Sequence, residues 1–250
     1  MRFQLIIGTG LLALSSHAVA DAYTCSDPNP VPTGEPTVGQ IFDFWCQPGI
    51  DETHETGTQL WTTADADGTA SFQLQFEFAG NRNINSFGLY DPFSNSQLQI
   101  FSGAAGSGAN AFIGISGSAG NWTITNFLTG GTLHSTTLMF GFYLDGAGDS
   151  VFYSQDHLNP NNARQVLSFV GDSAMQLCFE ARPCGNWGTT DWLLFWEDLP
   201  YPSADFDYND LIVSVKGVSA AVPEPGTLAL LGMGLIGVGA LRRRIGAVQS

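Results

Sequence analysis

Six carboxylates lie between residues 191 and 210, a stretch that contains no Lys or Arg. They are Asp191, Glu197, Asp198, Asp205, Asp207 and Asp210. Hard oxygen ligands gathered in a loop suit Ca²⁺, which takes six to eight oxygens. Crowded like charges also need a counterion or raised pKa values, and a bound cation meets that need. The sequence therefore predicts a calcium site, whose candidate ligands are Glu197, Asp198, Asp205, Asp207, Asn209 and Asp210.

The order of these side chains copies only the opening of an EF-hand. Asp205, Asp207 and Asn209 have the spacing of its first ligands, but Asp210 stands where Gly is required and Lys216 where a bidentate Glu is required. We therefore expect a different loop site, in which the earlier pair of carboxylates folds back on the later ones. The alternative is that these are turn carboxylates that cap strands through hydrogen bonds and hold no ion.

Other chemistry is less well supported. Paired carboxylates can hydrolyse glycosides, but acids crowded in one short loop fit a cation better than an acid and base pair. No Gly-x-Ser-x-Gly or His-Glu-x-x-His motif is present. Trp45, Trp61, Trp122 and Trp187 could stack on sugar rings, although large aromatic side chains of a sandwich mostly lie in its core. We predict a non-enzymatic protein with no catalytic residue, and the alternative is a carbohydrate-active protein, either a sugar-binding module or a glycoside hydrolase.

Short strands must position these residues. Polar and apolar residues alternate over 71–78, the pattern of a strand with one wet and one buried face. Similar runs, mostly separated by Gly, Asn, Asp or Pro, occupy 86–90, 97–101, 111–116, 121–125, 137–144, 150–153, 165–170, 174–179, 191–196 and 211–216. No stretch of the body keeps a 3.6-residue period for three turns. The sequence predicts an all-β, antiparallel, jelly-roll-like sandwich over 21–222, with 192–196 and 211–213 in central strands because they are apolar throughout.

The N-terminus has the features of a secretory signal peptide. Arg2 precedes an apolar run over 5–14, and small residues lead to a cleavage point after Ala20. Export places the four cysteines in an oxidising compartment, where three pairings are available. We favour the local one, Cys25 with Cys46 and Cys178 with Cys184.

The C-terminal residues 223–250 have the features of a second targeting segment. An extended Val222-Pro223-Glu224-Pro225 stretch is followed by an apolar run over 226–241, short for a membrane-spanning helix, and then by Arg242, Arg243 and Arg244. This tail closely resembles the PEP-CTERM sorting signal of Gram-negative bacteria. The resemblance implies recognition by a membrane transpeptidase of the exosortase type, passage through an inner-membrane intermediate, and removal of the tail. It also implies a secreted or cell-surface protein associated with exopolysaccharide and biofilm.

The body resembles a domain of unknown function found in exported bacterial proteins. The shared motif is Glu197-Asp198-Leu199-Pro200 followed by Asp207-Tyr208-Asn209-Asp210 and a strand. The resemblance implies a β-rich extracellular module with no assigned activity. The net charge of the body is compatible with an extracellular module. Residues 21–222 hold four basic and 22 acidic side chains, a formal charge of −18. Such a field repels phosphate backbones and anionic lipids, which excludes nucleic acid as a partner and limits membrane contact to the tail.

Overall fold

The computed structural model describes residues 34–64, 68–76, 84–118, 120–146, 150–172, 175–178 and 184–221. The predicted signal peptide, Cys25 and the sorting tail, with the short transmembrane helix predicted there, lie outside the described residues. Of the helices that are described, none is long and apolar enough to cross a membrane.

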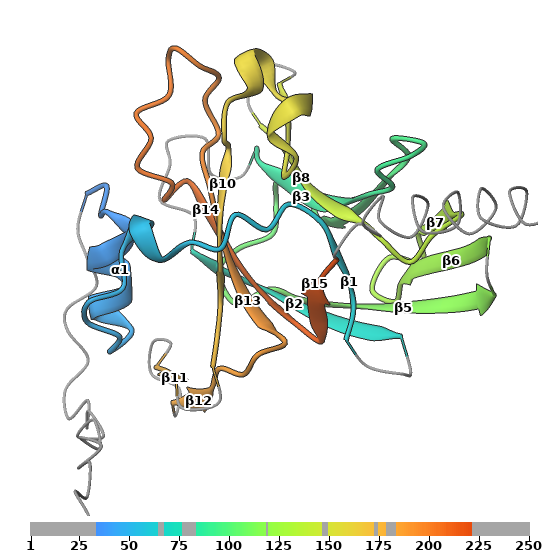
Figure 1. Cartoon of the computed structure of the whole chain (residues 1–250), viewed down its shortest axis with the longest axis horizontal. Coiled ribbons are helices and arrows are strands. Elements are labelled where there is room, and N and C mark those ends of the chain that lie inside the picture. The colour runs from blue at the N-terminus through green and yellow to red at the C-terminus, as the bar shows by residue number, and fades with distance from the viewer. Residues whose placement is uncertain are drawn as a thin grey trace, which may run out of the picture.

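In the described part of the chain, the larger sheet has seven antiparallel strands in the order β10-β13-β14-β2-β5-β6-β7 (Figure 1). Their bounds are β2 (Thr69–Phe76), β5 (Asn110–Ser118), β6 (Asn121–Asn126), β7 (Thr132–Ser135), β10 (Val166–Val170), β13 (Asp191–Trp196) and β14 (Leu211–Lys216). Two strands that are central in this order, β13 and β14, pair along their whole length from Asp191↔Lys216 to Trp196↔Leu211. This confirms the prediction that 192–196 and 211–213 belong to central strands.

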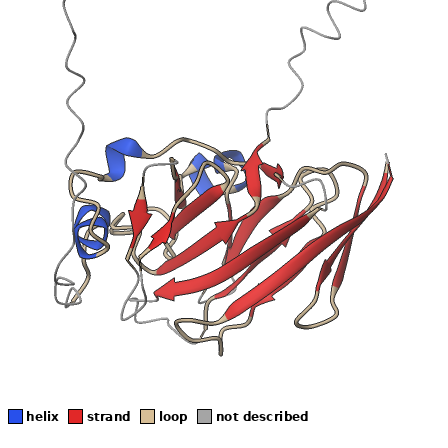
Figure 2. Cartoon of the chain, turned by 90° about the horizontal axis from the view of Figure 1, so that it is seen from below, coloured by secondary structure: helices blue, strands red, loops and turns tan. Residues whose placement is uncertain are grey.

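A smaller antiparallel sheet packs against the first, in the order β4-β3-β8-β9 (Figure 2). Its strands are β3 (Ser86–Tyr90), β4 (Gln97–Phe101), β8 (Gly141–Asp145) and β9 (Val151–Tyr153). Two short pairs complete the described strands: β1 (Trp61–Thr63) with β15 (Val218–Ala220), and β11 (Gln176–Leu177) with β12 (Gly185–Asn186). The prediction of an all-β antiparallel sandwich is confirmed.

The main core lies between the two sheets and is rich in aromatic rings. The Trp61 ring is tilted against Phe142 with 4.6 Å between the centroids, and Phe87 stacks on Phe142 at 5.5 Å. Trp196 meets Phe87 edge-on at 6.2 Å, which joins β13 to the smaller sheet. All four side chains are fully buried, and each ring removes a large apolar area from water. Burial of this kind is the main force that holds the sheets together.

A second core covers the outer face of β10, β13 and β14. Side chains alternate along a strand, so Leu193 and Phe195 point away from the main core. They pack instead under helix α1 (Val38–Phe44), whose Phe42 lies 5.4 Å from Phe195. Both faces of β13 are therefore covered, which explains its continuously apolar sequence.

Helix α1 was not predicted, because its seven residues are too few to establish a 3.6-residue period. Its start is nevertheless encoded by a capping box. The Thr37 hydroxyl accepts from Gln40 N at 3.4 Å, and Gln40 Oε1 accepts from Thr37 N at 3.0 Å. These bonds satisfy two backbone donors that the helix itself leaves free.

We expect Thr37→Ala to lower the free energy of unfolding by about 1 kcal/mol, the usual cost of losing such a cap. In a domain of this size the melting temperature should fall by roughly 2–4 °C. Thr136→Ala, an exposed threonine in a bend, is the matched control. Equal melting temperatures for the two variants, measured by circular dichroism, would show that the box does not stabilise α1.

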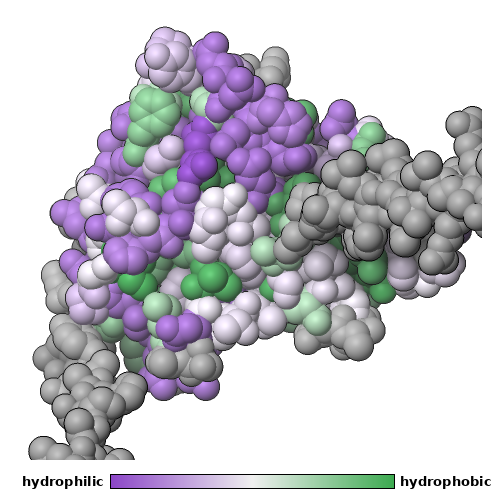
Figure 3. All heavy atoms as spheres, viewed as in Figure 1, coloured by the Kyte–Doolittle hydropathy of each residue, from purple (hydrophilic) through white to green (hydrophobic). Residues whose placement is uncertain are grey.

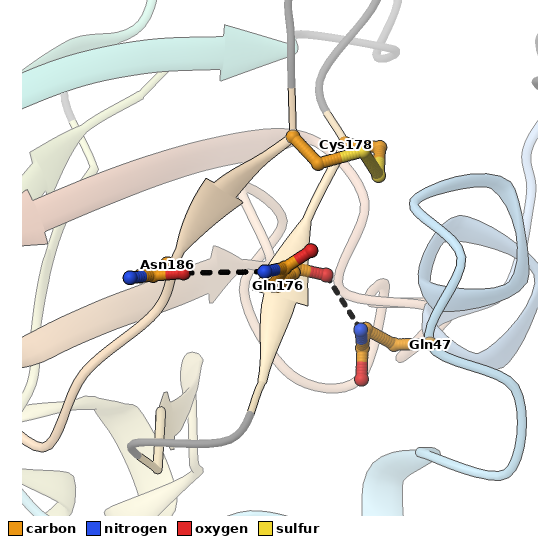
Figure 4. Close-up of a disulfide and its surroundings, with 5 residues drawn as sticks. Gln47, Gln176, Cys178 and Asn186 are labelled. Atoms are coloured by element: carbon orange, nitrogen blue, oxygen red, sulfur yellow. Dashed lines mark hydrogen bonds between the residues drawn. A yellow bond between two sulfur atoms is a disulfide. The ribbon is translucent and has the colours of Figure 1, made fainter. Parts of the chain in front are cut away.

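The disulfide Cys178–Cys184 closes the β11–β12 hairpin, with 4.0 Å between the Cα atoms (Figure 4). This confirms one of the two predicted bridges; the other, Cys25 with Cys46, falls partly outside the described residues. The hairpin is also tied to the segment after α1, because Gln47 Nε2 donates to the Gln176 carbonyl at 2.6 Å. The bridge thus strengthens one edge of the second core.

Candidate metal centre

The predicted ligands lie in the loop over 197–210, which joins the neighbouring strands β13 and β14. Beyond the last strand pair, Asp210 N donates to the Trp196 carbonyl at 3.2 Å, and Glu197 N donates to the Gln165 carbonyl at 3.0 Å. The sheet therefore continues for one residue on each side. These backbone bonds fix where the first and last carboxylates of the loop point.

Glu197, Asp198 and Asp210 form a buried group, with one carboxylate oxygen from each lying within 4.8 Å of the others. Glu197 is 0 %, Asp198 1 % and Asp210 9 % exposed. Asp198 N donates to Asp210 Oδ2 at 2.7 Å, and Asn85 Nδ2 donates to Asp198 Oδ2 at 2.7 Å. Because Asn85 directly precedes β3, the group lies where the two sheets meet. We call it the buried triad.

The Glu197 carboxylate also shapes the loop. Its Oε1 accepts from Leu199 N at 3.0 Å and its Oε2 from Phe206 N at 2.9 Å. Phe206 and Tyr208 both have left-handed backbone conformations, with φ of 61° and 55°. Bulky residues rarely adopt this region, and such strain concentrates at functional loops. One buried carboxylate thus holds a strained turn in place.

A second, more accessible group combines Asp205 and Asp207 with Glu35, and its carboxylate oxygens also lie within 4.8 Å of one another. Asn209 joins this group to the segment before α1. Its Nδ2 donates to the Pro36 carbonyl at 3.0 Å and also to Asp207 Oδ2. We call Glu35, Asp205 and Asp207 the outer triad.

Burial and mutual repulsion act on both triads. Burial, followed by the nearby charge of Asp210, raises the pKa of Glu197 to about 8. Burial, followed by the charges of Asp198, Asp207 and Asp205, raises the pKa of Asp210 to about 7. Burial also raises the pKa of Asp207, with Asp205 and Glu35 adding repulsion. The fold therefore gathers carboxylates whose ionised forms repel one another.

Amide oxygens beside the carboxylates supply the test of whether a cation fits. Asn85 Oδ1, Gln165 Oε1 and Asn209 Oδ1 are buried, and none has a hydrogen-bond partner among the described residues. A Cβ placed on Gly146 would lie 3.3 Å from the Asp198 carbonyl oxygen and 3.7 Å from Asn85 Oδ1, so both oxygens border the space that this glycine leaves open. Buried acceptors normally have donors. Carboxylates beside amide oxygens that lack donors match the ligand set of a hard cation.

The predicted ligands therefore divide into two groups instead of forming one. The predicted folding back occurs for Glu197 and Asp198, which meet Asp210, whereas Asp205 and Asp207 meet Glu35. Sequence reasoning missed Glu35 because nothing in its surroundings signals a contact with a loop 170 residues away. It missed Asn85 and Gln165 for the same reason, although each stands directly before a strand.

The fold and this site define an acidic all-β sandwich module with carboxylate clusters in one inter-strand loop. Residues 121–218 match a domain of unknown function (DUF4114), and residues 221–244 match the PEP-CTERM protein-sorting motif. The chain is thus a PEP-CTERM protein with this domain in its body. The motif implies recognition by an exosortase and an extracellular, surface-directed protein that is held at the membrane and then processed. No curated protein and no solved structure matches the chain.

The domain match covers less than the folded sandwich. It begins at β6 and ends at β15, yet β2 and β5 lie between β14 and β6 in the larger sheet. Without β2 and β5 the matched strands of this sheet would separate into two groups, β10-β13-β14 and β6-β7. The structural unit that carries the candidate metal centre therefore starts well before residue 121.

Proposed function

We propose that the mature protein is a non-enzymatic, calcium-stabilised sandwich that serves as a structural or binding component of an exopolysaccharide or biofilm matrix. The buried triad carries this proposal, because its three carboxylates are sequestered and adjoin amide oxygens that lack donors. Glu197 and Asp210 also have raised pKa values. A divalent cation would stabilise the ionised forms of these crowded carboxylates. The extracellular destination implied by the sorting motif supports the matrix role.

The donor set favours calcium among the common metals. It consists of carboxylate and amide oxygens, whereas zinc prefers His nitrogen and Cys sulfur. Magnesium demands a compact octahedral site and keeps several waters, which a nearly dry triad does not accommodate well. Calcium accepts six to eight oxygens in irregular geometry. Glu197, Asp198 and Asp210 would hold the ion, with Asn85 as a neutral ligand.

Burial also supports a non-enzymatic role over the alternative of a glycoside hydrolase. A hydrolase needs two carboxyl groups that flank an accessible glycosidic bond. Glu197 and Asp198 are almost wholly shielded from solvent, so a sugar chain cannot reach between them. Turnover of an extracted matrix polysaccharide that Glu197→Gln abolishes would contradict this part of the proposal.

Calcium titration by calorimetry tests the metal site. EDTA-treated wild-type protein should bind Ca²⁺, and Asp198→Asn should weaken the affinity about tenfold or more, because it removes one of three ligand charges. Asp91→Asn is a matched control: Asp91 is also buried, but it follows β3 at the end opposite Asn85, where it caps a turn by accepting from Phe93 N. Wild-type protein that takes up no calcium at millimolar concentration would refute the site.

A further inference from the structure

A cleft of about 550 Å³ lies beside the metal centre, between the 197–210 loop and the segment before β10. Its lining consists of Asn161, Ala163, Arg164, Tyr201, Phe206 and Tyr208. The two walls come from the orange loop and the yellow 3-10 helices that project at the same end of the molecule in Figure 1. Tyr208 Oη donates to the Arg164 carbonyl at 3.3 Å, which joins one wall to the other.

The cleft presents aromatic rings to solvent. Tyr201 is 50 % exposed and Phe206 40 % exposed, and their ring centroids lie 6.3 Å apart. Tyr208 continues the row at 6.5 Å from Phe206. Large aromatics elsewhere on this loop's strands are buried, so the chain displays these rings despite the cost of exposing them. In Figure 3 this end of the molecule is largely hydrophilic, with a small apolar area among the polar residues.

The polar part of the lining carries little net charge. Arg164 is paired with Glu55 and, at 3.6 Å, with Asp156. Its guanidinium therefore offers donors without an unbalanced positive charge, and Asn161 adds a neutral amide. The strongly acidic chain repels anionic ligands. Ring faces beside neutral hydrogen-bonding groups match a sugar, which has an apolar C–H face and a hydroxyl edge.

We infer that this cleft binds a neutral glycan, with sugar rings lying against Tyr201 and Phe206. The volume falls within the usual range for small-ligand sites. Peptides commonly bind by adding a strand to an open sheet edge, whereas this lining comes from loop side chains. The inference rests on the proposed function, because the loop that carries both rings is held by Glu197 of the buried triad.

An array of neutral, anionic and peptide probes, read with the calcium-loaded full-length mature chain, tests the inference. Neutral oligosaccharides should be retained, and Phe206→Ala and Tyr201→Ala should each lower their affinity about tenfold or more. Phe93→Ala, which removes an exposed Phe from the turn between β3 and β4, should change it less than twofold. Retention of no neutral glycan, retention of basic peptides alone, or equal losses in all three variants would overturn the inference.

Calcium-dependent melting, recorded on the same samples, separates this inference from the proposed function. Phe206→Ala keeps the backbone N–H that donates to Glu197. The rise in its melting temperature with calcium should therefore equal that of wild type. A normal calcium shift without glycan binding overturns the cleft alone. Glycan binding without a calcium shift overturns the metal site and leaves the cleft standing.

Discussion

Calcium at one hundred times its dissociation constant is expected to raise the free energy of unfolding by about 2.7 kcal/mol, and at one thousand times by about 4.1 kcal/mol. The unfolded chain has no preformed triad, so binding energy becomes folding energy. For a domain of this size the lower figure corresponds to a rise of roughly 5–10 °C in melting temperature. EDTA should reverse the shift completely.

Two variants show whether the shift comes from the buried triad. Asp198→Asn should lose most of it, whereas Asp91→Asn should retain it in full. Scanning calorimetry at fixed ionic strength is the appropriate measurement, because general screening of the acidic surface by any salt also changes stability. Identical melting curves with calcium and with EDTA would remove the structural basis of the proposed site.

Much of the fold could be predicted because its signals are local. Alternation over 71–78 predicts β2, observed over Thr69–Phe76, and continuous apolar runs predict β13 and β14. The strand predicted over 137–144 was wrong at its start, since β8 begins at Gly141. Phe140 nevertheless forms an isolated bridge with Trp61. Strands as short as β1 and β15 escape detection because three residues are too few to show a period.

The candidate metal centre was predictable only as far as its residues are near in sequence. Glu197, Asp198 and Asp210 carry a clear signal because one loop holds them all. These three residues are separated from Asp205 and Asp207 by the strand pairing. The pairing places Asp210 beside Trp196, whereas the middle of the loop lies beyond the paired strands. Asn85 lies directly before β3, which belongs to the smaller sheet. Such contacts are products of tertiary packing, and no single sequence displays them.

The cation-free protein should become less stable as the pH rises from about 4 to 8. Glu197 and Asp210 have pKa values near 8 and 7 in the folded chain, above the ordinary values they regain on unfolding. Within this interval the folded state binds more protons than the unfolded state, so the free energy of unfolding falls with pH. Their stabilising contribution is complete below about pH 4 and lost above about pH 8. Calcium should oppose this trend, because it binds the ionised carboxylates.

Asp210→Asn should therefore have opposite effects with and without calcium. Asn can still accept from Asp198 N through its side-chain oxygen, while one buried charge is removed. Without cation at pH 8 the variant should melt about 2–4 °C above wild type, equivalent to roughly 1 kcal/mol of relieved repulsion. At pH 5 this advantage should shrink, because wild-type Asp210 is then protonated. In saturating calcium the order should reverse, since the variant has lost a ligand. A variant less stable than wild type under all three conditions would show that Asp210 acts through its hydrogen bond alone, and that its charge is not held for a cation.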